Sequence, residues 1–70
     1  MSRPRSGTVL AYSGAACAGI IVTRDGIRYV FELRNCEPER GPPAAGDFVL
    51  FEPSGDGYAV RVKTVRSGAG

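Results

Sequence analysis

The stretch GIIVTRDGIRYVFELR, residues 19–34, contains two apolar runs on either side of the dipeptide Asp25-Gly26. Both runs are rich in β-branched and aromatic residues, which favour strands. Asp-Gly between alternating hydrophobic residues is a strong signal for a β-hairpin, because both turn positions must tolerate positive φ. We therefore expect two antiparallel strands in this stretch, joined by a tight turn.

Three more apolar runs of similar length complete a set of five, which covers residues 7–12, 18–23, 27–33, 47–52 and 58–65. Turn-forming Ser, Asp and Gly residues separate most of them. The one long connection, residues 37–46, contains three prolines, which disfavour both helix and strand. No window has a long helical period. The pattern predicts an all-β protein, a small closed or nearly closed barrel.

The length of 70 residues allows one domain. We expect a flexible arm over residues 1–6, the folded domain over 7–66 and a flexible tail over 67–70. A hydrophobic content of 43% is enough for a core, and the net charge of +2 is mild. No apolar stretch has the length of a signal peptide or a membrane helix. We therefore expect a cytoplasmic protein of bacterial type with no membrane contact.

The residue types needed for catalysis or metal binding are scarce. The chain contains no histidine, and its acidic residues are scattered. Cys17 and Cys36 lie far apart and do not form a zinc motif. In a reducing cytosol we expect both to be free thiols, and a single bridge between them is the alternative. The sequence predicts no catalytic residue, no metal and no cofactor, and hence a binding module.

Several segments carry a family resemblance, in this order along the chain: GTVLAY (7–12), CAGII (17–21), DGIRYVFEL (25–33), AGDFVLFE (45–52) and GYAVRVKTV (57–65). In motif and spacing they resemble the cold-shock domain, whose members bind single-stranded RNA and DNA. The resemblance covers about 60 of the 70 residues. It implies a five-stranded antiparallel barrel of the OB-fold type.

The resemblance also implies a binding surface, because the family stacks bases on a platform of aromatic side chains. Tyr12 and Phe31 are the aromatic residues that stand at platform positions here. The remaining platform positions carry non-aromatic residues, namely Ala11, Ala18, Ile20, Leu33 and Arg34, and Leu10 stands in place of the family's first-strand lysine. Each stacked base is worth about 1–3 kcal/mol, so the missing partners imply weak binding. Tyr29 and Tyr58 are expected to pack rather than to bind.

The third expected strand allows two orientations. Strict alternation buries the face that carries Tyr29 and Phe31. The resemblance instead turns Phe31 and Leu33 outward and directs Val30 and Glu32 toward the core. A buried Glu32 would need compensation. Either the strand ends early, or Glu32 pairs with an arginine, or the outer face is covered.

The first functional hypothesis is weak, sequence-tolerant binding of single-stranded RNA or DNA. Residual stacking and arginine contacts to phosphates would provide it. The candidate binding residues are Tyr12, Ile20, Arg28, Phe31, Leu33, Arg34, Arg61 and Lys63. The alternative hypothesis is a barrel without nucleic-acid binding, whose apolar face contacts another protein or a second copy of the chain.

Overall fold

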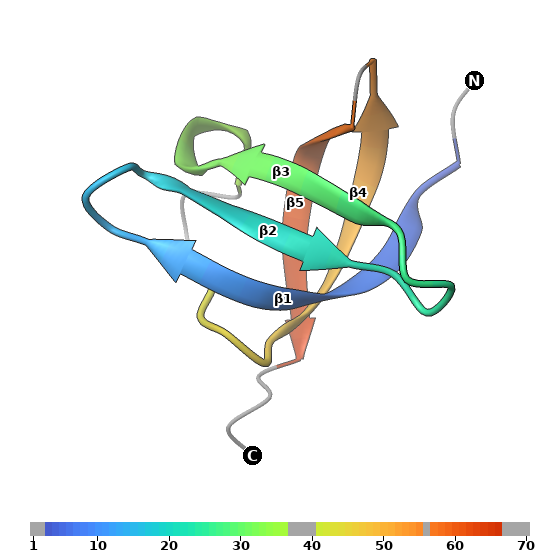
Figure 1. Ribbon diagram of the computed structural model, residues 1–70, viewed down its shortest axis with the longest axis horizontal. Helices are drawn as coiled ribbons and strands as arrows, with labels where there is room; N and C mark the ends of the chain where they lie inside the picture. The colour runs from blue at the N-terminus through green and yellow to red at the C-terminus, as the bar shows by residue number, and fades with distance from the viewer. Residues whose placement is uncertain (1–2, 37–40, 56, 67–70) are drawn as a thin grey trace.

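The computed structural model describes residues 3–36, 41–55 and 57–66 (Figure 1). It contains five strands, which are β1 (Arg5–Ser13), β2 (Ala18–Val22), β3 (Arg28–Glu32), β4 (Phe48–Ser54) and β5 (Tyr58–Arg66). A short 3-10 helix, η1 (Leu33–Asn35), follows β3. The five expected strands are thus confirmed, with ends that move by one or two residues.

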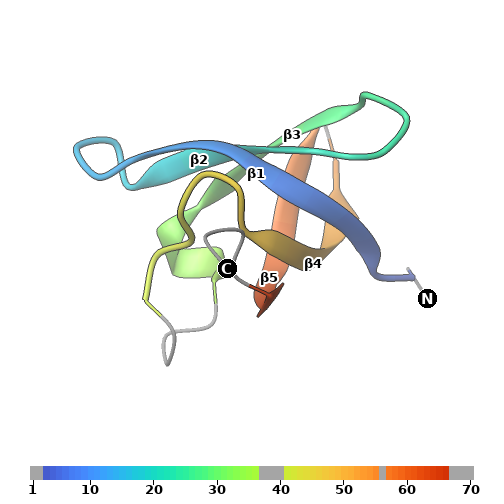
Figure 2. The ribbon, with the colours of Figure 1, turned by 90° about the horizontal axis from the view of Figure 1, so that it is seen from below.

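The strands form a closed barrel in the order β1-β2-β3-β5-β4, with β4 paired back to β1. The views in Figures 1 and 2 show β1, β2 and β3 as one layer, with β4 and β5 crossing behind it. This confirms the predicted all-β barrel and is consistent with an OB-fold-like domain. One feature differs from the expectation, because β3 and β5 run parallel. Parallel neighbours need a long connection, which η1, the following loop and β4 provide.

Strand β1 is longer than expected and belongs to both halves of the barrel. Its first residues pair with β4 and its later residues pair with β2, with a register shift between Val9 and Ala11. Such a bulge bends a strand and helps a barrel to close. Because β1 begins at Arg5, Arg5 and Ser6 are part of the sheet and not of a flexible arm. The expected tail, 67–70, and residues 37–40 of the long connection lie outside the described residues.

The β2–β3 turn forms where Asp25-Gly26 predicts it, with a different geometry. The Gly26 amide donates to the Thr23 carbonyl at 2.9 Å, and the Thr23 amide donates to the Ile27 carbonyl at 2.9 Å. Gly26 has φ of 84°, whereas Asp25 does not have a positive φ. The loop therefore has three residues and ends in a left-handed glycine. The buried Thr23 stabilises it, because its Oγ1 donates to Asp25 Oδ1 at 3.0 Å and accepts from the Ile27 amide at 3.2 Å.

All five strands contribute to the core, which consists of Val9, Ile21, Phe31, Val49, Phe51, Ala59 and Val62. Phe31 is fully buried, with 0% of its surface exposed, and its neighbour Val30 is 41% exposed. The orientation implied by the resemblance, with Phe31 outward and Val30 inward, is therefore wrong. Alternation predicts this strand correctly: Tyr29 also packs against the core, with its ring 5.0 Å from that of Phe51.

Gly19 is the cross-strand partner of Phe31 and leaves the space that its ring fills. A Cβ at position 19 would lie 2.5 Å from Phe31 Cζ and 2.5 Å from the Ala11 carbonyl oxygen. The ring of Tyr12 stacks on that of Phe31, with centroids 6.1 Å apart and planes 17° apart. Tyr12 is thus turned to the inner side of the sheet, where it partly covers the core.

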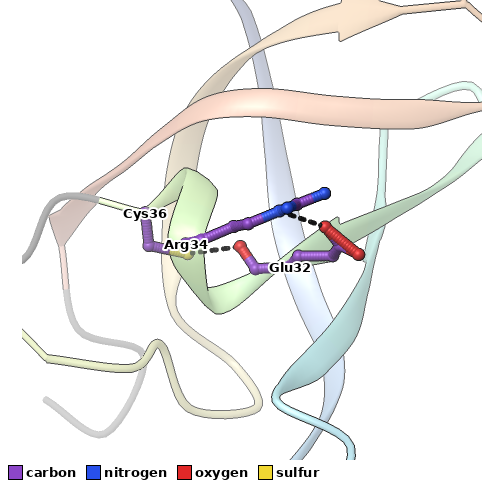
Figure 3. Close-up of polar contacts among 3 residues, drawn as sticks. All are labelled: Glu32, Arg34 and Cys36. Carbon is purple, nitrogen blue, oxygen red and sulfur yellow. Dashed lines mark hydrogen bonds and ion pairs between the residues drawn. The ribbon is translucent and has the colours of Figure 1, made fainter.

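The open question about Glu32 is resolved at the end of β3. The strand ends at Glu32, and Leu33 already belongs to η1. The Arg34 guanidinium donates through Nε to Glu32 Oε1 at 2.7 Å (Figure 3). Of the three alternatives, the pairing with an arginine is therefore confirmed, whereas the strand still includes Glu32. Glu32 itself lies beside Ala18 on the outer face and is half-buried.

Replacing Gly19 by alanine is expected to lower the free energy of unfolding by about 1–3 kcal/mol or more, because the new methyl group overlaps the Phe31 ring and the Ala11 carbonyl oxygen. Urea denaturation followed by circular dichroism measures this change. Gly14→Ala is the matched control, since nothing lies within 4 Å of its Cβ. Equal stability of the two variants would contradict the packing of Phe31 against Gly19.

Phe31→Ala is expected to cost about 3–5 kcal/mol of stability, because it opens a cavity in the centre of the core. This is comparable to the whole stability of a domain of this size. Phe48→Ala is the control, because Phe48 is 37% exposed and lies outside the core. Thermal denaturation of both variants separates the two cases, and a similar melting temperature for both would show that Phe31 is not a core residue.

Candidate functional site

The outer face of β1, β2 and β3 carries a group of small apolar side chains. Ala11 of β1 lies opposite Ile20 of β2, which in turn lies opposite Val30 of β3. Together with Tyr12, Ser13, Ala18 and Gly19, these residues line a shallow, almost entirely apolar hollow of about 350 Å³. The hollow forms because the side chains of Ala11 and Ala18 are short. The residues between the outward ones point inward, or have no side chain in the case of Gly19, and so do not fill it.

Tyr58 extends this group across the barrel. It is the parallel partner of Val30 at the start of β5, and 52% of its surface is exposed. The neighbouring pair Phe31 and Ala59 points inward, so Val30 and Tyr58 share the outer side. We call Ala11, Ala18, Ile20, Val30 and Tyr58 the outer patch. The expectation that Tyr58 packs against the protein is not met, because half of it is open to solvent.

Charged residues stand at both ends of the outer patch. Arg28 is exposed and lies opposite Val22, one outward pair beyond Ile20 and Val30 toward the β2–β3 turn. At the other end Arg34 is exposed and is paired with Glu32 (Figure 3). The guanidinium of Arg28 is therefore available to an anion, whereas that of Arg34 is partly neutralised by the Glu32 carboxylate.

The other predicted binding residues are less accessible or lie elsewhere. Phe31 is buried in the core, and Tyr12 stacks on it while it also lines the hollow. Leu33 is half-buried in η1, and its amide donates to the Cys17 carbonyl at 2.9 Å. The remaining two are on β5 away from the patch. Arg61 lies 3.8 Å from a Glu52 carboxylate oxygen, and Lys63 lies opposite Leu50.

Of the eight predicted residues, the structure thus brings Ile20, Arg28 and Arg34 to one surface, with Tyr12 at the border of its hollow. It adds Val30 and Tyr58, which sequence reasoning missed. Alternation alone turns Val30 outward, so that signal was present in the sequence. Tyr58 depends on the parallel pairing of β3 with β5, which joins segments far apart in the chain.

Two titratable groups near the outer patch, Tyr12 and Cys36, have raised pKa values. Desolvation raises the pKa of Tyr12, and burial raises the pKa of the Cys36 thiol. Cys36 Sγ lies 3.6 Å from the Glu32 carbonyl oxygen (Figure 3), and both cysteines are free thiols. A raised pKa keeps a thiol protonated and unreactive at neutral pH. Within the described ranges, no group of three or more His, Cys, Asp or Glu side chains is arranged to hold a metal ion.

No helix within the described part of the chain is long and apolar enough to cross a membrane. The strand order, with β1 next to both β2 and β4, is the feature consistent with an OB-fold-like domain. No model of a known protein family matches the chain, and no curated protein sequence matches it.

Proposed function

We propose that this chain binds single-stranded nucleic acid weakly and without sequence preference, with bases lying on the outer patch, in the manner of a divergent cold-shock domain. One observation supports this above the others. Three residues aligned with base-contacting positions of that family, Ala11, Ala18 and Ile20, share an open face with the exposed ring of Tyr58. Arg28 stands at one end of this face, in reach of a phosphate.

The composition of the patch determines the strength of binding. Tyr58 is its exposed aromatic residue and offers one stacking partner, worth about 1–3 kcal/mol, because the half-buried Tyr12 beside it is already stacked on Phe31. The aliphatic residues exclude water from a base without stacking on it. Arginine contacts to phosphates supply the remainder and are independent of sequence. The expected dissociation constant is therefore in the range of non-specific binding, about 10⁻⁴–10⁻⁶ M at physiological salt.

The same patch supports a second candidate function, contact with another protein or with a second copy of this chain. The supporting observation is that four of its five side chains are aliphatic. Exposed apolar patches often mark protein contacts. The two functions predict different responses of the same variants.

Tyr58→Ala is expected to weaken binding of a fluorescein-labelled oligo(dT) or oligo(U) by about 5- to 150-fold, which corresponds to the loss of one stacked base. An oligonucleotide of about ten nucleotides lies within the range that one OB-fold covers. Fluorescence anisotropy at low salt measures the affinity. Phe48→Ala is the matched control, because it removes another partly exposed aromatic ring that lies on β4, outside the outer patch.

Equal losses in the two variants would contradict the assignment of the outer patch. Absence of oligonucleotide binding by the wild-type protein at low salt would overturn the proposed function. In that case a dimer detected by light scattering, and abolished by Ile20→Glu, would establish the protein-contact alternative.

A further inference from the structure

A second surface, distinct from the outer patch, lies at the end of the barrel where the chain starts. The beginning of β1 and the β2–β3 turn are at the same end of the molecule in both ribbon views (Figures 1 and 2). Between them is an open groove of about 620 Å³. Its polar lining consists of three arginines, two hydroxyl groups and one carboxylate, from Arg3, Arg5, Arg24, Ser6, Thr23 and Asp25.

The charges in this groove are not balanced. Arg5 is held in place, because its Nη1 donates to the Tyr29 hydroxyl at 3.1 Å. Among the described residues, the ion pairs are those of Arg34 with Glu32 and of Arg61 with Glu52, so neither Arg3 nor Arg24 takes part in one. Three guanidinium groups and one carboxylate leave the groove with a local charge of +2.

The carboxylate in the groove is itself engaged. Asp25 Oδ1 accepts a hydrogen bond from the Thr23 hydroxyl at 3.0 Å, and this bond is the main cause that lowers the Asp25 pKa. The charge of Arg5 lowers that pKa further. Asp25 is thus ionised at neutral pH and fixed to the turn through Thr23. One carboxylate held in this way does not neutralise three arginines.

The turn holds Arg24 at a defined place in this groove. The two backbone hydrogen bonds between Thr23 and residues 26 and 27 close the loop on either side of it. Thr23 is buried, so the turn is tied to the body of the barrel. The backbone of Arg24 is therefore held in place, so that only its side chain has to be ordered when a ligand binds.

The outward residues of β2 and β3 lead from the outer patch toward the groove. On β2 and β3 the outward pair Ile20 and Val30 is followed by Val22 and Arg28, about 7 Å nearer to the turn. Arg24 stands just beyond that pair, at the edge of the groove. A single strand with bases on the outer patch would thus reach Arg28 first and the groove next.

We propose that this groove binds the phosphates of a single-stranded nucleic acid whose bases occupy the outer patch, an inference that rests on the proposed function. Guanidinium groups suit this ligand, because their planar donors match the phosphate oxygens in pairs. Phosphate contacts carry no sequence information and give binding a steep dependence on salt. The two surfaces thus have separate roles: the outer patch contacts the bases, and the groove binds the phosphates.

The double variant Arg3→Ala/Arg24→Ala tests this division. Each lost phosphate contact on a single strand reduces the slope of log affinity against log salt by about 0.7, so the double variant is expected to lose about 1.4. Between about 20 mM and about 200 mM salt, the advantage of the wild-type protein over the variant then shrinks by about 25-fold. Anisotropy titrations with labelled oligo(dT) across this range give the slopes.

Two further variants separate this inference from the proposed function. Lys63→Ala removes a positive charge on β5 outside the groove and is expected to keep the wild-type slope. Tyr58→Ala is expected to lower affinity at every salt concentration without changing the slope. Phosphate binding in the groove would be contradicted by a wild-type slope in the double variant, or by a loss of slope per charge in Lys63→Ala equal to that in the double variant. Either result would leave the proposed function unaffected. If the wild-type protein binds no oligonucleotide, both are overturned.

Discussion

The contact between the Phe31 ring and the backbone of Gly19 fixes the orientation of the strands around it. No side chain fits at position 19 beneath this ring, so the pair is possible only with glycine on the inner side of β2. Because side chains alternate along a strand, an inward Phe31 turns Val30 outward, and an inward Gly19 turns Ala18 and Ile20 outward. The outer patch is thus a consequence of how the core is packed.

The same contact explains why the outer face is poor in aromatic rings. A domain of 70 residues buries a smaller share of its surface than a larger domain does, and its core needs large side chains. Of the three phenylalanines and three tyrosines, Phe31 and Phe51 are buried, and Tyr12 and Tyr29 pack against them. The aromatic residues left outside are Phe48 and Tyr58. Relative to the orientation that the cold-shock resemblance implies, β3 is turned by one residue. Phe31 is therefore in the core and is not available for stacking.

Local signals in the sequence were sufficient for the strands and the β2–β3 hairpin, because each depends on neighbours in the chain. The features that were missed depend on distant contacts. Tyr58 joins the outer patch through the parallel pairing of β3 and β5. Arg5 was read as part of a flexible arm, whereas pairing of β1 with β4 makes it part of the barrel. The three-residue turn was missed because Asp-Gly suits more than one turn type.

The distribution of charge has more influence on binding here than its total. Nine basic and seven acidic residues leave a net charge of +2, too little for attraction over long distances. In the described part of the chain, Glu32 and Glu52 each pair with a nearby arginine on the barrel surface. The arginines at the start of β1 and in the β2–β3 turn share one groove with a single carboxylate, and Thr23 holds that carboxylate. A protein that is almost neutral overall therefore presents a concentrated positive charge at one end, next to a surface with almost none. This arrangement is the reason for the proposal above, because a single strand with its bases exposed is apolar along one side and anionic along the other.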